Sequence, residues 1–244
     1  LDRICMSQAV SPIQKDLDLS NKNISFVLMA FTLAYGIFEI PSGRMGDKWG
    51  SRRVLARIVL WWSFFTALTG ACVEFYSLLL VRFLFGAGEA GALPNTARVI
   101  SRWFPPHERG RIQGLILAFA QIGGVIAPIV SAFFIHHIGW RLTFLSFGCI
   151  GVVWAIGFWF WFRDDPAQHS GVNEEELKHI QSAGKLPAME HSAIPWAKVL
   201  TNRGIIFLGL IIIMGSFFSY FFYSWFPKYL EAARKLDNME AGKF

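Results

Sequence analysis

Six apolar stretches of membrane-spanning length dominate this chain. They fall near residues 24–43, 55–73, 77–98, 112–136, 142–162 and 205–227. About 20 apolar residues are needed for an α-helix to cross a bilayer core of about 30 Å. Because the backbone polar groups of a spanning segment must be satisfied within hydrocarbon, stretches this long are predicted to be helices. The sequence therefore predicts an all-α polytopic membrane protein.

The composition agrees with a membrane location and argues against a nucleic-acid partner. The chain is 54% hydrophobic and only 16% charged, whereas soluble domains carry about 25% charged residues. The net charge of +6 comes from residues that lie between the apolar spans rather than along one amphipathic face. Cys5, Cys72 and Cys149 are odd in number and show no metal-ligand spacing. The expected partner is the lipid bilayer, and we expect neither a bound metal nor a disulfide framework.

The distribution of basic residues sets the expected orientation. Residues 44–57, 98–111 and 163–203 hold fourteen Lys and Arg, whereas the loops on the opposite side hold only Lys15, Lys22 and Arg141 before the last span. Basic residues accumulate on the cytoplasmic side of membrane proteins. The segment 44–57 is therefore predicted to be cytoplasmic, in a multi-pass protein of the plasma membrane, with a bacterial inner membrane expected.

The chain divides into three expected parts. Residues 1–162 are predicted to be a six-helix bundle, 163–203 a cytoplasmic linker, and 204–244 the first helix of a second bundle. The chain has no initiating Met, and residues 1–12 look like the outer half of a helix whose start is missing, so we interpret it as a fragment. In the linker, Asn173 and Glu176 resemble a capping box, which predicts a short surface helix over 174–182.

Four ionisable residues are predicted to lie within the membrane: Asp2, Arg3, Arg82 and Glu89. With the outer helix end near Lys15, Arg3 would lie about 18 Å deep, near the bilayer centre. A charge there costs about 2.5–3.5 kcal/mol, so such residues are functional candidates. Arg82 and Glu89 share one helix face about 10.5 Å apart, although Arg82 is near the outer boundary and could instead snorkel.

Glu89 is expected near the middle of the 77–98 span, between small residues. Gly86, Gly88, Ala90 and Gly91 surround it, and such a surface lets helices approach closely or leaves room for a ligand. Burial there favours the protonated carboxyl, which suits a proton carrier. Arg3 offers a planar fork of donors that matches a carboxylate, and the buried hydroxyl and amide of Tyr35 and Gln121 could meet sugar hydroxyls.

A basic, glycine-containing turn follows the 24–43 span. It resembles the loop between the second and third helices of major facilitator superfamily transporters, through Gly43, Asp47, Lys48, Gly50, Arg52 and Arg53, with Gly46 as a further glycine of the turn. The resemblance implies the N-terminal six-helix half of a twelve-helix major facilitator fold, plus the start of the second half. It also implies that these seven residues form a gating segment. In this segment, Asp47 would hold helix ends together in one conformational state.

Further motifs are similar to the anion:cation symporter family within that superfamily. They are Asp2-Arg3, the glycine-rich run from Arg82 to Pro94, and the segments 102–110, 139–141, 163–166, 194–196 and 225–230. The resemblance assigns Arg3 to the substrate carboxylate, Asp2 and Glu89 to proton coupling, and Arg82 to organising these charges. It assigns Tyr35, Gln121 and Tyr220 to substrate contacts. Gln121 is the loosest of these matches, because the fifth helix aligns poorly.

The resemblance implies proton-coupled symport of an organic anion by alternating access. The substrate would be a sugar acid of the hexuronate, galactonate or glucarate type, the coupling ion a proton with no other cofactor, and the functional unit a monomer. Alternatives are an aromatic-carboxylate carrier, a proton-coupled drug exporter and a non-transporting membrane sensor. The run from Gly124 to Ser131 lacks the glycines expected of drug exporters, and residues 205–227 lack the arginine expected of organophosphate exchangers. No nucleophile or metal motif of an enzyme occurs in the spans.

Overall fold

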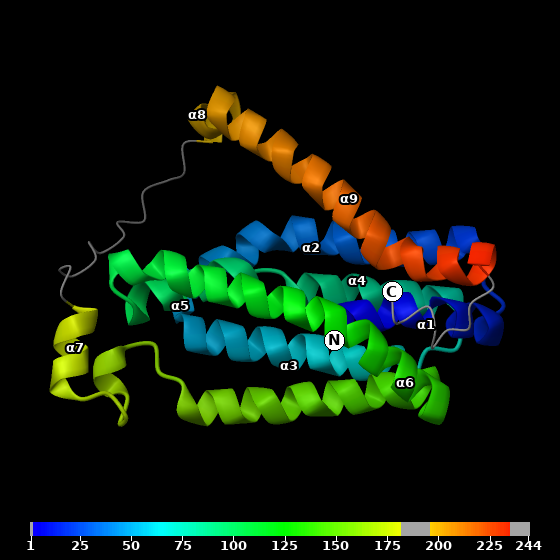
Figure 1. The fold of residues 1–244 in the computed structure, drawn as a ribbon, viewed down its shortest axis with the longest axis horizontal. Helices are drawn as coiled ribbons and strands as arrows, with labels where there is room; N and C mark the ends of the chain where they lie inside the picture. Colours follow the sequence, from blue (N-terminus) through cyan, green and yellow to red (C-terminus); the bar gives the residue numbers. More distant parts are fainter. Residues whose placement is uncertain (1, 182–195, 235–244) are drawn as a thin grey trace.

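The computed structural model describes residues 2–181 and 196–234, and their regular structure is entirely helical (Figure 1). The helices are α1 (Asp2–Leu17), α2 (Asn21–Trp49), α3 (Ser51–Thr69), α4 (Phe75–Glu89), α5 (Ala92–Trp103), α6 (Pro106–Trp161), the 3-10 helix η1 (Pro166–Gln168), α7 (Glu174–Ile180), α8 (Trp196–Thr201) and α9 (Arg203–Arg234). The predictions for residues 182–195 and 235–244 lie outside the described part of the chain.

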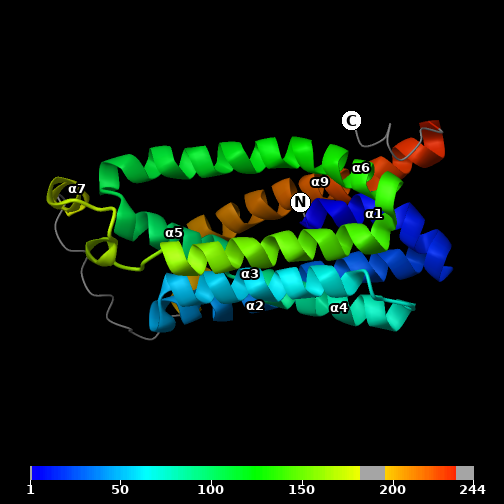
Figure 2. The ribbon, with the colours of Figure 1, turned by 90° about the horizontal axis from the view of Figure 1, so that it is seen from below.

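The described helices confirm a polytopic membrane protein. The regions Asn21–Trp49, Phe75–Trp103, Pro106–Trp161 and Arg203–Phe222 are long and apolar enough to cross a membrane. Helix α6 contains both predicted spans 112–136 and 142–162, because it reverses direction at Gly139 (Figure 2). Gly139 has φ 76° and ψ 161°, a conformation that side chains other than glycine rarely adopt.

The predicted span 77–98 is not one continuous helix. It divides at Ala90 and Gly91 into α4 and α5. Gly91 has φ 86° and packs against Ser42 of α2, so its conformation and its lack of a side chain both permit the break. The buried amide of Asn95 donates to the carbonyl oxygens of Gly91 (2.7 Å) and Ser42 (3.3 Å). Glu89 is consequently the last residue of α4 rather than a mid-helix residue.

The basic turn is also shorter than the sequence indicates. Helix α2 continues to Trp49 and α3 begins at Ser51, so Gly50 alone separates them. Gly50 has φ 85°, and its amide donates to the carbonyl of Gly46. Most of the segment 43–53 is therefore helical, because one glycine in this conformation is enough to reverse the chain.

The core lies between α1, α2, α4 and the two halves of α6. Its centre is formed by fully buried apolar residues: Ile13, Ile24, Leu78, Phe85 and Phe144. Gly148 of α6 meets the backbone of Ser63, which brings α3 and α6 close together. In lipid, close packing of this kind replaces the hydrophobic effect as the force that holds helices together. Large apolar side chains such as Phe119 and Phe160 remain exposed on the outer faces, as lipid contacts require.

A polar cluster connects the ends of the helices opposite the basic turn. Arg141 donates to the carbonyls of Gly70 and Cys72 and forms an ion pair with Asp16 (2.9 Å), which also accepts from the Trp140 indole. This network explains the Gly-Trp-Arg motif, since Gly139 turns the chain and the next two residues bind the neighbouring loops.

Helix α9 joins the bundle at one end only. Near its C-terminal end, Lys228 donates to Gln14 and Asn21 at the junction of α1 and α2. From there α9 diverges from the bundle toward α8 (Figure 1). At the other end of the molecule, the short helix α7 is confirmed as capped by Asn173, which accepts from the amide of Glu176 (2.8 Å), and it ends at Ile180.

Candidate functional site

An ion pair between α1 and α4 forms the centre of the candidate site. Nε of Arg3 lies 2.8 Å from Oε1 of Glu89, and the two side chains are 41% and 14% exposed. Opposite charges that neutralise one another in this way reduce the cost of placing each of them in the membrane. Arg3 thus presents part of its guanidinium outward while Glu89 is largely enclosed, and Oε2 of Glu89 is buried without a hydrogen-bond partner in the described residues.

Aromatic rings of α2 support Arg3. Its guanidinium carbon lies 4.5 Å from the ring centroid of Tyr35 and 5.1 Å from that of Phe31. A cation over an aromatic face is held by the ring quadrupole, and the attraction reaches about 2 kcal/mol when the pair is desolvated. Tyr220 of α9 is close enough to interact electrostatically with Arg3. Three of the residues assigned to substrate contact therefore lie together.

Arg82 is buried rather than snorkelling. Its side chain is 2% exposed, and its guanidinium carbon lies 4.3 Å from the centroid of Phe85 and 5.3 Å from that of Phe31. Its Nε and Nη1 have no hydrogen-bond partner in the described residues. It interacts electrostatically with Glu89 and Asp2. Phe31 contacts the guanidinium groups of both Arg3 and Arg82. This role could not be predicted from the sequence, where Phe31 is one of many apolar residues in a membrane span.

Asp2 and Gln121 lie away from the exposed part of Arg3. Asp2 lines a separate cavity of about 310 Å³ with Val59, Trp62 and Phe147 of α3 and α6, although it interacts electrostatically with Glu89. Gln121 is exposed on the first half of α6, and no hydrogen bond or ion pair within the described ranges joins it to this cluster. Neighbours in sequence point to different sides of a helix, which separates Asp2 from Arg3.

The basic segment makes contacts of a different kind. Asp47 forms an ion pair with Arg98 of α5. The backbone amide of Arg52 donates to Asp164 (2.9 Å), and its guanidinium donates to the Trp159 carbonyl. A Cβ on Gly46 would overlap the Asn95 side chain, so α2 and α5 touch there. Gly43 adjoins Pro94, and Lys48 and Arg53 are exposed. The segment thus connects α2, α3, α5 and the end of α6.

An ion pair inside a bundle of membrane-spanning helices, and a basic segment that connects helix ends at one surface, define a polytopic membrane protein with a charged interior. The Major Facilitator Superfamily model matches residues 1–243, and the chain belongs to this family, whose members are transporters rather than enzymes.

Curated relatives are named as transporters of small organic anions. The chain is 32% identical to the probable sulfoacetate transporter SauU of Cupriavidus necator over 100% of its length and 56% of that protein. It is 34% identical to the probable galactarate/D-glucarate transporter GudP of Bacillus subtilis over 99% of its length and 56% of that protein. The chain therefore spans about half the length of the curated relatives it matches.

A solved structure shows the same fold. The bacterial homologue of the human lysosomal transporter Spinster, in an inward-facing and unoccupied conformation, superposes with a TM-score of 0.76 at 23% identity, covering 99% of this chain and 54% of that one. The match confirms the predicted major facilitator architecture and, with the family, an integral multi-pass protein of the plasma membrane.

Proposed function

We propose that the full-length protein transports a small organic anion together with protons by alternating access. The observation that carries this proposal is the position of Arg3, which is held by Glu89 and Tyr35 yet remains 41% exposed within a membrane bundle. We expect a bundle over 1–162, a linker over 163–203 and a second bundle from 204. The proximity of Arg3 to Tyr220, beyond the linker, supports a site between the two bundles, where facilitators bind substrate.

The proposed substrate class is a sugar acid or a comparable small carboxylate or sulfonate. Arg3 pairs with Glu89 through Nε, so its terminal amino groups can still bind an anionic oxygen pair side by side. Tyr35 and Tyr220 supply hydroxyl groups near the same place, and we keep Gln121 as a contact for the far end of the substrate. Relatives bearing names for galactarate, glucarate, hexuronate and sulfoacetate transporters support this class.

The proposed proton coupling follows from the sharing of the Arg3 charge between Glu89 and the substrate. A substrate carboxylate that binds Arg3 weakens the pair with Glu89, whose side chain is only 14% exposed. A buried carboxylate that loses its counter-ion is stabilised by taking up a proton. Anion and proton then bind together, and each tightens the binding of the other. Asp2 and Arg82 tune this exchange through the field at Glu89, and the protein works as a monomer.

Uptake by the full-length protein in liposomes tests this proposal. With an inward proton gradient, we expect accumulation of galactarate or glucarate, and loss of it in Arg3→Ala, because a buried charged hydrogen bond contributes several kcal/mol to binding. Arg3→Lys keeps the charge but not the fork, so it should bind more weakly than the parent and better than Arg3→Ala.

Three outcomes would contradict the proposal. Unchanged substrate affinity in Arg3→Ala would show that Arg3 does not bind the substrate. Efflux of lipophilic cations without any anion uptake would instead identify a drug exporter, and the absence of all transport would favour a sensor.

A further inference from the structure

An apolar groove lies on the outer face of the bundle between α3 and the second half of α6. It has a volume of about 870 Å³, and its walls include Leu60, Trp61, Phe64, Ile156 and Phe160. Helix α3 and the second half of α6 lie across the bundle from α9 (Figure 1). The residues that line the groove come from these two helices and not from those that carry Arg3 and Glu89. Its position and its lining make it a lipid-facing groove.

Two arginines close one end of this groove. Arg53 and Arg57 both line it and lie four residues apart on α3, so they share one helix face. They lie at the end of α3 that the positive-inside rule places in the cytoplasm. The groove therefore has a cationic end at the membrane surface and an apolar length that runs into the membrane.

Among the residues that the structure describes, no carboxylate forms an ion pair with either arginine of this end. Nε and Nη2 of Arg57 are buried without a hydrogen-bond partner in the described residues, and its Nη1 contacts only the Met45 sulfur at 3.6 Å. The acidic residues nearby are committed elsewhere, since Asp47 pairs with Arg98 and Asp164 accepts from the Arg52 backbone. Arg53 is exposed and forms no ion pair in the described part of the chain.

We propose that this groove binds an anionic phospholipid. Its phosphate and headgroup would pair with Arg53 and Arg57, and an acyl chain would lie against the apolar walls. Guanidinium groups bind phosphate oxygens through paired charged hydrogen bonds, and basic pockets between spanning helices on the cytoplasmic side bind anionic headgroups. A zwitterionic lipid carries its own cation, which the two unbalanced arginines disfavour. The bound lipid would fasten α3 to α6 without touching the transport site.

Native mass spectrometry of the purified full-length protein can test this, with phosphatidylglycerol and phosphatidylcholine as the two probes. We expect phosphatidylglycerol to be retained in preference, and Arg53→Gln/Arg57→Gln to lower its apparent affinity about 30-fold, because each basic residue near an anionic headgroup contributes roughly a factor of five. Arg44→Gln/Lys48→Gln is the matched control, since it removes the same charge from the same membrane surface outside the groove. This control should retain the lipid.

Equal lipid loss in both double variants would overturn the proposal in favour of general surface charge, as would equal retention of both lipids by the parent. Arg53→Lys/Arg57→Lys keeps the charge and guards against a folding defect, so it should retain most of the binding. Quenching of groove tryptophans by brominated phosphatidylglycerol, reduced in Trp61→Phe/Trp159→Phe, gives a second readout that does not depend on transport. A failure of the anion-transport proposal would leave these results unchanged.

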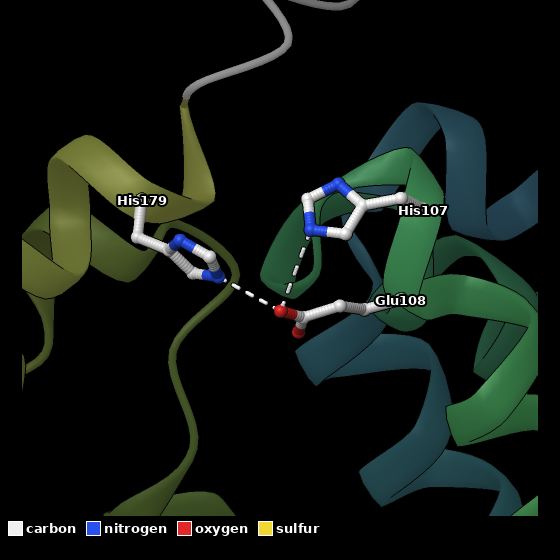
Figure 3. Close-up of side chains that lie close together, drawn as sticks. All are labelled: His107, Glu108 and His179. Atoms are coloured by element: carbon white, nitrogen blue, oxygen red, sulfur yellow. Dashed lines mark hydrogen bonds and ion pairs between the residues drawn. The ribbon is translucent and has the colours of Figure 1, made fainter.

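A second cluster, at the same end of the molecule, joins the linker helix α7 to the start of α6. Nε2 of His179 lies 2.8 Å from Oε1 of Glu108, and Nε2 of His107 lies 3.6 Å from the same oxygen (Figure 3). Potential ligand atoms of all three residues lie within 4.8 Å of one another. All three side chains reach water, so an ion from solution could reach them.

We further propose that this cluster binds a divalent transition metal of the zinc class. Two imidazole nitrogens and one carboxylate oxygen form a usual zinc ligand set, with a fourth position left for water. Metal–ligand distances of about 2.0–2.2 Å place tetrahedral ligand atoms roughly 3.4 Å apart, which small rotations of these exposed side chains can reach. The ion would replace the hydrogen bond between His179 and Glu108 and hold α7 against α6.

Titration of the purified full-length protein with Zn²⁺, with Co²⁺ absorption as a second probe, tests the metal site. We expect one ion per chain and at least a tenfold loss of affinity in His107→Ala/His179→Ala, since each ligand contributes strongly to such a site. His136→Ala/His137→Ala is the control, because that adjacent pair lies at the opposite end of the molecule. Binding that is absent from the parent, or equal in both double variants, would refute the site.

Discussion

At the scale of single residues, the two membrane arginines have different environments and therefore different expected roles. Arg3 forms an ion pair and is partly exposed, whereas Arg82 is enclosed and two of its nitrogens have no hydrogen bond within the described residues. An exposed guanidinium can exchange its partner for a substrate, whereas an enclosed one acts mainly through its electrostatic field. Both effects act on the carboxylate of Glu89.

Replacement of Glu89 by Gln should separate binding from coupling. The amide mimics the protonated carboxyl, so Glu89→Gln should still bind substrate and exchange it across the membrane. It should fail to concentrate substrate when only a pH gradient is imposed, because no proton can be taken up at this position. The measurement is accumulation and counterflow in liposomes. Normal pH-driven accumulation would show that Glu89 has only a structural role.

Phe31 provides a test of the aromatic support. It contacts the guanidiniums of both Arg3 and Arg82, and loss of a cation–π contact costs about 1 kcal/mol. Phe31→Leu should therefore weaken anion binding about fivefold, whereas Phe31→Tyr should bind like the parent. Equilibrium binding by both variants measures this, and equal affinity in Phe31→Leu would show that the ring only fills space.

The sequence identified the charged residues of the site but not their surroundings. Arg3 and Glu89 could be predicted because an ionisable residue in a span is costly and therefore conspicuous. Phe31 could not, because one more Phe in an apolar helix carries no signal. The orientation of Asp2 could not be predicted either. The side of the bundle that a residue faces depends on how the helices pack, and packing is not encoded at a single position.

At the scale of helices, the runs of apolar residues predicted where the spans lie but not where the helices end. The apolar runs located the spans, but the break at Gly91 and the continuation of α2 to Trp49 both depend on contacts between helices. Gly91 meets Ser42, and Gly46 meets Asn95. Such contacts join residues about fifty positions apart, so local periodicity cannot reveal them. We therefore expect α2 and α5 to move together as one block.

The ion pair between Asp47 and Arg98 should control the rate at which this block changes conformation. Asp47→Asn removes the charge but keeps the shape, and we expect slower transport with nearly unchanged substrate affinity. Arg98→Gln should have the same effect, because it removes the other partner. Transport rates and equilibrium binding of both variants provide the measurement. A large loss of affinity with an unchanged rate would place Asp47 in the binding site instead.

At the scale of the whole molecule, α9 meets the bundle at one end and diverges from it at the other (Figure 1). The contacts of Lys228 with Gln14 and Asn21 lie at the end opposite the basic segment. We therefore expect this contact to close the outer end in one conformational state of the full-length protein.

A disulfide across this contact should hold the outer end closed. Asn21→Cys/Lys228→Cys, in a background where Cys149 is replaced because it is exposed, should lose uptake on oxidation and regain it on reduction. Substrate binding to the oxidised protein in detergent should persist, because the inner side stays open. A pair of cysteines at Asn21 and Arg141 serves as the control. Uptake that survives oxidation of the Asn21/Lys228 pair would mean that this contact does not open during transport.

The direct contact between Arg3 and Glu89 has an electrical consequence. With this pair formed, and with Asp2 and Arg82 both ionised, these four charges sum to zero and contribute no net charge movement when the empty carrier returns across the bilayer. The membrane potential, worth about 2.3 kcal/mol per charge per 100 mV, then acts at this site only through the substrate and the protons that are bound. A monoanion with one proton would cross without responding to voltage, whereas a dianion such as glucarate would need two protons to do the same. The voltage sensitivity of uptake therefore depends on the number of protons carried with each substrate.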